Sequence, residues 1–130
     1  MSDDNLVLPE QQPTMRIPAR PTDTNAAGDI FGGWIMSQVD IAGSIAASRL
    51  ARGRTVTVAV NAIHFKKPVY VGDLISLYAT VVKVGNTSMT VDVEVYAERK
   101  PQNPKIIKVT EATLTYVAVD EHGQPRPVTP

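Results

Sequence analysis

The chain has 130 residues, with 13 basic and 13 acidic side chains, a formal net charge of zero and no cysteine. That length suits one domain, and the balanced charge argues against a nucleic-acid-binding protein, which usually carries a basic excess. The absence of cysteine excludes disulfides, thiolate nucleophiles and metal sites ligated by cysteine.

The two ends of the chain are predicted to lie outside the folded domain. Residues 1–13 are polar and hold prolines, and residues 120–130 are rich in proline, so we expect a flexible arm and a flexible tail. The domain then spans residues 14–119. The first residues lack a basic stretch followed by an apolar one, and no apolar run approaches the ~20 residues of a membrane span. We therefore expect a cytoplasmic protein that does not enter a membrane.

Hydrophobic patterning predicts one long helix among several strands. Residues 14–18 suit a short first strand, and residues 21–28 hold turn-forming residues without periodicity. Residues 29–52 contain no proline and are rich in alanine and isoleucine, which predicts a helix that Gly53 ends. The remaining segments are rich in β-branched residues or alternate between apolar and polar ones, and are predicted as strands: 55–65, 74–84, 88–97 and 105–119. This order predicts an α+β domain whose helix packs on one face of an antiparallel sheet.

One acidic residue, Asp40, lies in the middle of the predicted helix. Burying an unpaired carboxylate is costly, so its presence there needs a reason. Its neighbours on a helical wheel are mostly small, with Met36 as the large exception: Gly33, Ser37, Gly43, Ser44, Ala47 and Ala51. Small side chains would leave room for a ligand beside a catalytic carboxylate. The same stripe would also serve close packing around a structural aspartate, and both interpretations stay open.

Gly32 and Gly33 precede or open this helix. The N–H groups of a first helical turn have no partner within the helix and lie at the positive end of its dipole. A carbonyl oxygen docked there would be polarised, and a developing oxyanion would be stabilised. Asp40 follows Gly33 by about two turns on the same side, which suggests an acid–amide pair for acyl transfer. The paired glycines would also suit a tight loop or a close helix–sheet contact.

Few other side chains are of a catalytic type. His64 lies in a predicted strand and His122 in the predicted tail, and two isolated histidines do not make a metal site. We therefore expect neither a metal nor a cofactor. Ser37 and Ser44 share the face of Asp40, but no histidine stands at an informative spacing, which argues against a serine hydrolase.

The run from Asp23 to Asp40, which includes Asn25, Gly32 and Gly33, resembles the signature of YciA-like acyl-CoA thioesterases. Several later segments resemble that family as well: 56–60, Phe65, Pro68, 71–73, 83–85 and 115–120. The resemblance covers nearly the whole domain and leaves out only the two ends. It implies a hotdog fold, in which a curved antiparallel sheet of about five strands wraps one long central helix.

The resemblance also implies an activity, which is hydrolysis of acyl-CoA thioesters to free acid and CoA. It implies homodimers, often assembled into hexamers, with active sites between subunits. On the matching positions Asp40 would be the catalytic carboxylate, acting as general base or nucleophile. The Gly32/Gly33 amides would polarise the thioester carbonyl. Asn25 would lie opposite, from the partner subunit, and Thr57 nearby on the second strand.

CoA carries several phosphate charges, and basic residues near strand ends are candidates to bind them: Arg54, Lys66, Lys67 and Lys83. Each of these could instead be a solvated surface charge. Two other functions stay open. A hydratase or dehydratase of the same fold would usually use an aspartate–histidine pair, and the loop–helix segment has no histidine. A non-catalytic acyl-CoA-binding module would bind the thioester without turnover.

Overall fold

The computed structural model describes residues 6–129 and has one long α-helix and five β-strands in this part of the chain. In chain order the elements are β1 (Met15–Pro18), the short 3-10 helix η1 (Pro21–Asp23), α1 (Gly32–Ala51), β2 (Thr55–Phe65), β3 (Leu74–Val84), β4 (Ser88–Arg99) and β5 (Lys105–Ala118). The predicted helix and strands are confirmed, with differences of a few residues at their ends.

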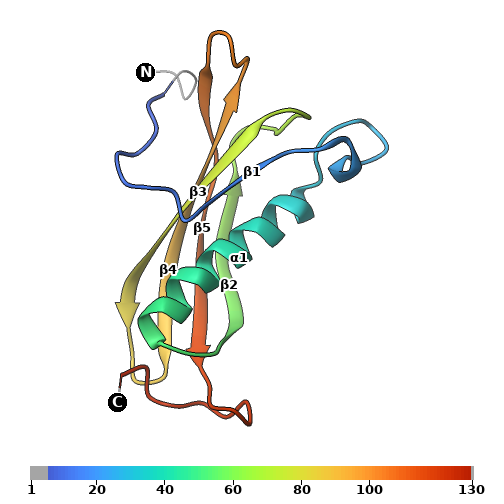
Figure 1. The fold of residues 1–130 in the computed structure, drawn as a ribbon. Coiled ribbons are helices and arrows are strands. Elements are labelled where there is room, and N and C mark those ends of the chain that lie inside the picture. The colour runs from blue at the N-terminus through green and yellow to red at the C-terminus, as the bar shows by residue number, and fades with distance from the viewer. Residues whose placement is uncertain (1–5, 130) are drawn as a thin grey trace.

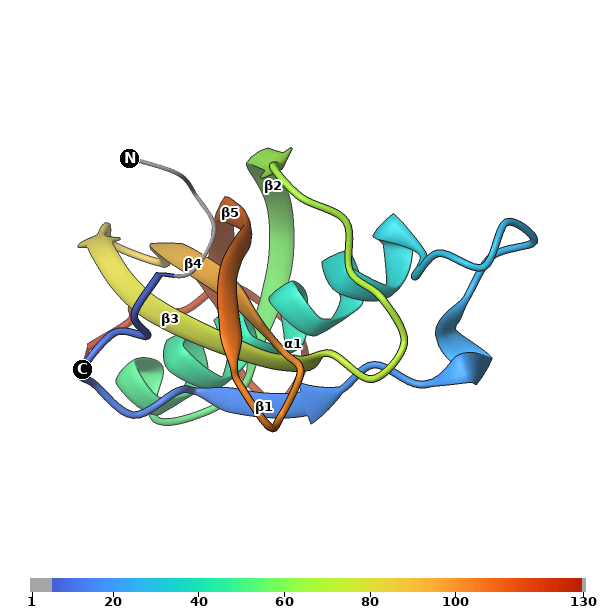
Figure 2. The ribbon, with the colours of Figure 1, turned by 90° about the horizontal axis from the view of Figure 1, so that it is seen from above.

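The strands form one antiparallel sheet in the order β1-β3-β4-β5-β2. The sheet curves around α1, which crosses its concave face (Figure 1). Figure 2 shows the same arrangement from above, with β2 to β5 around the helix and β1 along its side. The predicted α+β architecture, a curved five-stranded sheet around one helix, is therefore confirmed. The strands β1 and β2 are the two edges of the sheet, and each has one side without a strand partner in the described chain.

The helix begins at Gly32 rather than at Asp29 because tertiary contacts hold the preceding residues extended. Ile30 donates its N–H to the Val69 carbonyl oxygen at 3.3 Å and forms an isolated β-bridge with Thr24. A residue tied to two other segments in this way cannot also take helical backbone angles. Local sequence patterns do not reveal such long-range contacts, so the predicted helix began too early in the chain.

The helix ends at Ala51, and Arg52 rather than Gly53 has the left-handed backbone conformation that often follows a helix, with φ 53°. Gly53 instead packs closely against the side chain of Arg126. A Cβ there would lie 2.7 Å from a guanidinium nitrogen of Arg126. Arg126 donates to the Ala51 carbonyl oxygen at 2.9 Å, which places a positive charge at the negative end of the helix dipole.

The core lies between α1 and the concave face of the sheet. The alternation in β4 sends one set of side chains inward, and these are fully buried: Met89, Val91, Val93 and Val95. The helix contributes Ile35, Val39 and the alanines Ala42 and Ala47, whose small size lets the strands approach closely. Each large apolar side chain buried in this way stabilises the fold by about 1.5–3 kcal/mol.

Both ends of the described chain contact the domain. The Leu6 N–H donates to the Ile106 carbonyl oxygen at 2.8 Å. Near the other end, Val128 is 2% exposed and its N–H donates to the Asn86 carbonyl oxygen at 2.9 Å. These contacts hold both segments against the sheet. The domain limits at 14–119 stay a prediction, and the first five residues of the expected arm lie outside the described residues.

The sheet covers one side of α1, and apolar side chains remain exposed on the other. Met36 and Ile41 on α1 are 40% and 48% exposed, and Val58 and Val60 on β2 are 54% and 44% exposed. We call these four residues the β2–α1 apolar face. Monomeric proteins rarely leave large apolar patches open, so this face is a candidate interface. Between residues 6 and 129, no helix has the length and apolar character needed to cross a membrane.

Candidate active site

Asp40 lies half-buried at the centre of α1, beside the two strands at that edge of the sheet. Its Oδ1 accepts hydrogen bonds from Thr57 Oγ1 on β2 (2.7 Å) and from Tyr116 Oη on β5 (2.9 Å). Thr57 and Tyr116 are register partners in the sheet, which is why both hydroxyl groups reach the same oxygen. Among residues 6–129, no donor is recorded for the other carboxylate oxygen, Oδ2. The carboxylate is therefore held on one oxygen and open on the other.

Tyr116 is a site residue that sequence reasoning did not single out. Its side chain is fully buried, and burial together with its hydrogen bond to Asp40 raises the pKa of the phenol well above its ordinary value. It therefore stays protonated and acts as a donor. A signal was present in the sequence: Tyr116 continues the inward-facing series of Ala112 and Leu114, and a hydroxyl on a buried face needs a partner.

Gly43 explains part of the small-residue stripe around Asp40. A Cβ at this position would lie 2.3 Å from Tyr116 Oη and 3.0 Å from Cζ of the same ring. At Gly43 the stripe therefore serves close packing, which brings the phenol to Asp40. At Gly33, in contrast, a Cβ would meet no atom within 4 Å, so that end of the stripe is open. The structure thus shows close packing at Gly43 and open space at Gly33, and the catalytic interpretation of Asp40 stays a prediction.

The two serines on this face are not placed as nucleophiles. Ser37 Oγ donates to the Gly33 carbonyl oxygen at 3.0 Å, and Ser44 Oγ donates to the Ile41 carbonyl oxygen at 2.7 Å. Helical serines commonly donate to the preceding turn in this way. Each hydroxyl therefore donates its proton to its own helix, and neither has a basic hydrogen-bond partner within residues 6–129.

The start of α1 opens onto a groove. Gly32 and Gly33 are exposed, and no acceptor for either N–H is recorded within the described chain. The groove has a volume of ≈ 260 Å³ and is walled by the helix start and the β2–β3 connection: Ile30, Gly32, Ile35, Phe65, Lys66, Lys67, Pro68 and Val69. Atoms of the Phe65 ring would lie 3.6 Å from a Cβ at Gly32, so the ring rests against the helix start. The groove thus combines free amides, an apolar wall and two lysines.

One chain cannot apply both Asp40 and the helix-start amides to one carbonyl group. Asp40 lies seven positions after Gly33 in α1, and a rise of 1.5 Å per residue separates them by about 10 Å along the axis. Hydrogen bonds to one small group need donors and acceptors within about 3 Å of it. The acid–amide pair suggested by the sequence is therefore divided, unless a second chain brings its own helix start to Asp40.

Asn25 lies in the loop between η1 and α1, which projects past the helix start in Figures 1 and 2. Its Oδ1 accepts the N–H groups of Ala27 (2.9 Å) and Asp29 (3.1 Å). That contact fixes the orientation of the amide and leaves Nδ2 as the outward group, for which no partner is recorded within residues 6–129. No contact joins Asn25 and Asp40 in this part of the chain.

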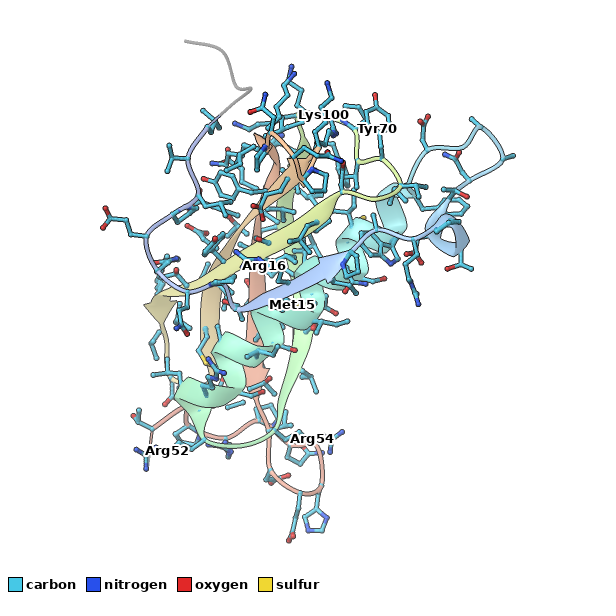
Figure 3. All side chains as sticks on the ribbon, turned by 45° about the horizontal axis from the view of Figure 1, so that its top comes forward. Met15, Arg16, Arg52, Arg54, Tyr70 and Lys100 are labelled. Atoms are coloured by element: carbon cyan, nitrogen blue, oxygen red, sulfur yellow. The ribbon has the colours of Figure 1, made fainter. Side chains whose placement is uncertain are left out.

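The basic residues predicted to bind CoA divide into two pairs. Lys66 and Lys67 follow β2 and line the groove, and Lys66 Nζ lies 3.6 Å from Glu111 Oε1. Arg54 precedes β2, and Lys83 lies near the end of β3. The strand β2 separates Arg54 from Lys66 by about 40 Å. In Figure 3, Arg54 accordingly lies at the opposite end of the molecule from Tyr70, a residue of the β2–β3 connection.

A larger hollow, ≈ 340 Å³, lies elsewhere on the sheet. It is polar and is lined by side chains of β2, β4 and β5 that include His64, Asp92, Glu94, Lys108 and Glu111. Lys108 Nζ bridges Glu94 (3.1 Å) and Glu111 (3.0 Å), so much of its charge is compensated internally. It contains neither Asp40 nor the free amides, and within residues 6–129 no cluster of metal-ligating side chains occurs.

Comparison with known proteins gives a consistent result. Residues 27–102 match the model of the thioesterase superfamily. The chain is 48% identical over 122 residues to a protein of Salmonella typhimurium named acyl-CoA thioester hydrolase YciA, covering 92% of each. Two solved structures are also similar. A hexameric hotdog fold thioesterase of Campylobacter jejuni has 50% identity, a TM-score of 0.86 and coverage of 90% of both chains. A hexameric thioesterase of Yersinia pestis has 49% identity, a TM-score of 0.85 and coverage of 92% of this chain and 97% of that one.

Proposed function

The chain belongs to the thioesterase superfamily, and we propose that it is an acyl-CoA thioester hydrolase that uses Asp40 as its catalytic carboxylate. The activity is that of the named relatives, with which nearly the whole chain aligns. The assignment of this residue rests on the hydrogen bonding of Asp40. Its Oδ1 accepts two hydroxyl donors, and its Oδ2 is left open. This arrangement fixes the carboxylate through one oxygen and leaves the other able to meet a water or a substrate.

In the proposed reaction, the thioester carbonyl oxygen accepts hydrogen bonds from the amides of Gly32 and Gly33. These amides sit at the positive end of the α1 dipole and stabilise the negative charge that develops on the oxygen. As a general base, Asp40 takes a proton from water while the water oxygen attacks the carbonyl carbon. The carbon–sulfur bond then breaks, and the CoA thiolate receives a proton.

As a nucleophile, Asp40 would attack the carbonyl carbon itself and expel CoA. The mixed anhydride so formed would then be hydrolysed by water. Both routes need one ionised carboxylate, and both are compatible with an open Oδ2. Thr57 serves either route by holding Oδ1 in place through its 2.7 Å hydrogen bond.

The active unit in this proposal is a homodimer, because one chain separates Asp40 from its own helix start by about 10 Å. In a two-fold dimer that buries the β2–α1 apolar face, β2 edges and helices of two copies lie side by side in opposite directions. Asp40 then faces Gly33 and Asn25 of the partner subunit. The outward Nδ2 of Asn25 would donate to the attacking water or to the carbonyl oxygen. The hexameric relatives support further assembly of such dimers.

Lys66 and Lys67 are proposed to bind CoA phosphates, since they line the groove that leads to the helix start. The apolar wall of the groove, including Phe65 and Val69, would cover the uncharged part of the ligand. Arg54 and Lys83 lie at the far end of the sheet. They would therefore contact the nucleotide of a CoA only if that CoA were bound mainly by another subunit.

Thiol release from acyl-CoAs of short to long chain tests the proposal. The protein contributes no thiol of its own, since it has no cysteine. The informative variant is Asp40→Asn, because the amide oxygen can accept the same two hydroxyl donors and the fold is preserved. A matched control is Asp92→Asn, which changes an exposed carboxylate that also accepts a threonine hydroxyl, from Thr113 at 3.0 Å.

We expect normal turnover in the wild type and in the Asp92→Asn control, and loss of most of kcat in Asp40→Asn. Equal turnover in both variants would refute the assignment of Asp40. Binding of acyl-CoA without turnover by the wild type would instead support a binding module. Formation or loss of an acyl-chain double bond without thiol release would support a hydratase or dehydratase.

A further inference from the structure

We propose that Tyr116 and Gly43 form a positioning pair that fixes the Asp40 carboxylate and leaves Oδ2 as its reacting oxygen. This inference rests on the proposed function, because it assumes that Asp40 takes part in the reaction. Neither residue touches the substrate in this proposal. Tyr116 acts through Asp40, and Gly43 acts through Tyr116.

The hydrogen bonds distinguish the two oxygens of the carboxylate. Oδ1 accepts the hydroxyl groups of Thr57 (2.7 Å) and Tyr116 (2.9 Å), which come from two neighbouring strands. Hydrogen bonds to a carboxylate stabilise its charge, and the oxygen that receives them becomes the less reactive one. The terminal torsion of an aspartate is otherwise broad, so two donors on one oxygen also fix the plane of the group. Proton uptake or attack then falls to Oδ2.

Tyr116 is suited to this role because it is a permanent donor. Its ring is fully buried in the core, and the raised pKa of its phenol keeps the proton in place across the range of an ordinary assay. The same Oη also lies 2.9 Å from the backbone carbonyl oxygen of Asp40. The one phenol proton is therefore shared between the backbone oxygen and Oδ1 of the residue that it positions.

The contact between Tyr116 and Asp40 requires a glycine at position 43. Gly43 lies one turn after Asp40, and a Cβ there would lie 2.3 Å from Tyr116 Oη, which no real side chain tolerates. Glycine is a poor residue for the interior of a helix, so its presence at the middle of α1 needs a packing reason. The approach of the phenol to Asp40 supplies that reason. An alanine at this position would favour the helix and displace the hydroxyl.

A double-mutant cycle of Tyr116→Phe and Gly43→Ala tests the pair, with kcat, KM and thermal unfolding measured for each variant. Tyr116→Phe removes a hydrogen bond to a charged group, so we expect kcat to fall about tenfold or more, with KM changed by less than about twofold. Gly43→Ala should cause a similar loss by pushing the hydroxyl away. The kcat of the double variant should be no lower than that of the less active single variant, because both changes break the same contact.

Tyr96→Phe is the matched control. Tyr96 is also largely buried, at 8% exposed, and its hydroxyl also donates to a carboxylate, that of Glu94 at 3.0 Å. Because this contact does not involve Asp40, we expect kcat to stay at the wild-type value. A general effect of losing a buried hydroxyl group would lower the unfolding temperature in both Tyr→Phe variants. It would not lower kcat in Tyr116→Phe alone.

The possible outcomes separate this inference from the proposed function. Loss of kcat in Asp40→Asn with full kcat in Tyr116→Phe would overturn the positioning role and leave the function intact. Additive losses in the double variant would overturn the pairing of Gly43 with Tyr116. A wild-type protein that releases no thiol from any acyl-CoA would overturn the proposed function, and the positioning role with it.

Discussion

Arg99 of β4 binds the buried carboxylate of Asp73, and we expect Arg99→Ala to destabilise the fold strongly. Arg99 Nε lies 3.0 Å from each carboxylate oxygen, and the two side chains are only 19% and 4% exposed. Without the guanidinium, the Asp73 carboxylate would stay buried with the Tyr70 N–H (2.9 Å) as its one remaining recorded donor within residues 6–129.

The expected loss of stability follows from the carboxylate charge that is left buried and unpaired. Removing one partner of a buried ion pair costs about 3–5 kcal/mol, of which most is the burial of the charge left behind. Arg99 also donates to the Pro68 carbonyl oxygen at 2.6 Å and stacks 4.4 Å from the centre of the Tyr70 ring. For a chain of this length, we therefore expect a fall in Tm of about 10–20 °C. Asp73→Asn in the same chain should restore part of it, because it removes the unpaired charge.

Thermal unfolding by circular dichroism at one fixed protein concentration measures the effect. Arg16→Ala is the control, because the exposed Arg16 donates to the hydroxyl of Ser76 (2.6 Å) and its loss should cost about 1 kcal/mol. A Tm for Arg99→Ala equal to that of Arg16→Ala would refute the reasoning. So would a double variant, with Asp73→Asn added, that is destabilised by the full sum of the two single effects.

Three further predictions concern other parts of the chain. The hydrogen bond from Lys108, at 3.0 Å, holds the pKa of Glu111 below its usual value of 4.5, so this contact stabilises the folded state above about pH 4.5 and is lost as the pH falls below it. Glu111→Gln should thus lower Tm slightly at pH 7 and have no effect at about pH 2, and an equal shift at both would contradict this. Replacing Lys66 and Lys67 together by glutamine should raise KM at low salt and leave kcat unchanged, which steady-state kinetics at two ionic strengths will check; a loss of kcat alone would exclude phosphate binding. Val58→Glu places a charge in the β2–α1 apolar face, and light scattering should then detect monomers without activity, whereas an active oligomer would place the interface elsewhere.

The sequence was sufficient to predict the order and type of the main elements. The alternation in β4 and the proline-free run of α1 depend on local periodicity, which a single sequence contains. The helix start was predicted three residues too early, at Asp29, since the bond between Ile30 and Val69 joins segments far apart in the chain. The left-handed position is Arg52 rather than Gly53, and Gly53 instead packs against Arg126, a residue far away in the chain.

The site was predicted less completely than the fold. Asp40 was singled out by its place in the predicted helix and Thr57 through the resemblance, and the two lie in contact, but Tyr116 was not identified as their partner. Its role depends on the register of β2 with β5, which periodicity does not determine. Close packing was one of two interpretations of the small-residue stripe, but the group packed against it was not predicted, because only the folded structure brings the phenol against Gly43. The division of Lys66 and Lys67 from Arg54 and Lys83 likewise depends on the direction in which each strand runs.

The central claim is that each active site combines Asp40 of one chain with the helix start and Asn25 of another. Two variants that are inactive alone test it when mixed. Asp40→Asn removes the carboxylate, and Asn25→Asp replaces the outward donor while keeping the oxygen that accepts the Ala27 and Asp29 amides. Equal amounts, unfolded together and refolded, form mixed dimers that hold one intact site and one doubly altered site.

Thiol release by this mixture is the measurement that tests the account most directly. Random pairing makes half of the dimers mixed, and half of their sites are intact, so we predict about a quarter of the wild-type activity. Each variant refolded alone should stay inactive. A mixture no more active than its two components would contradict a site shared between chains.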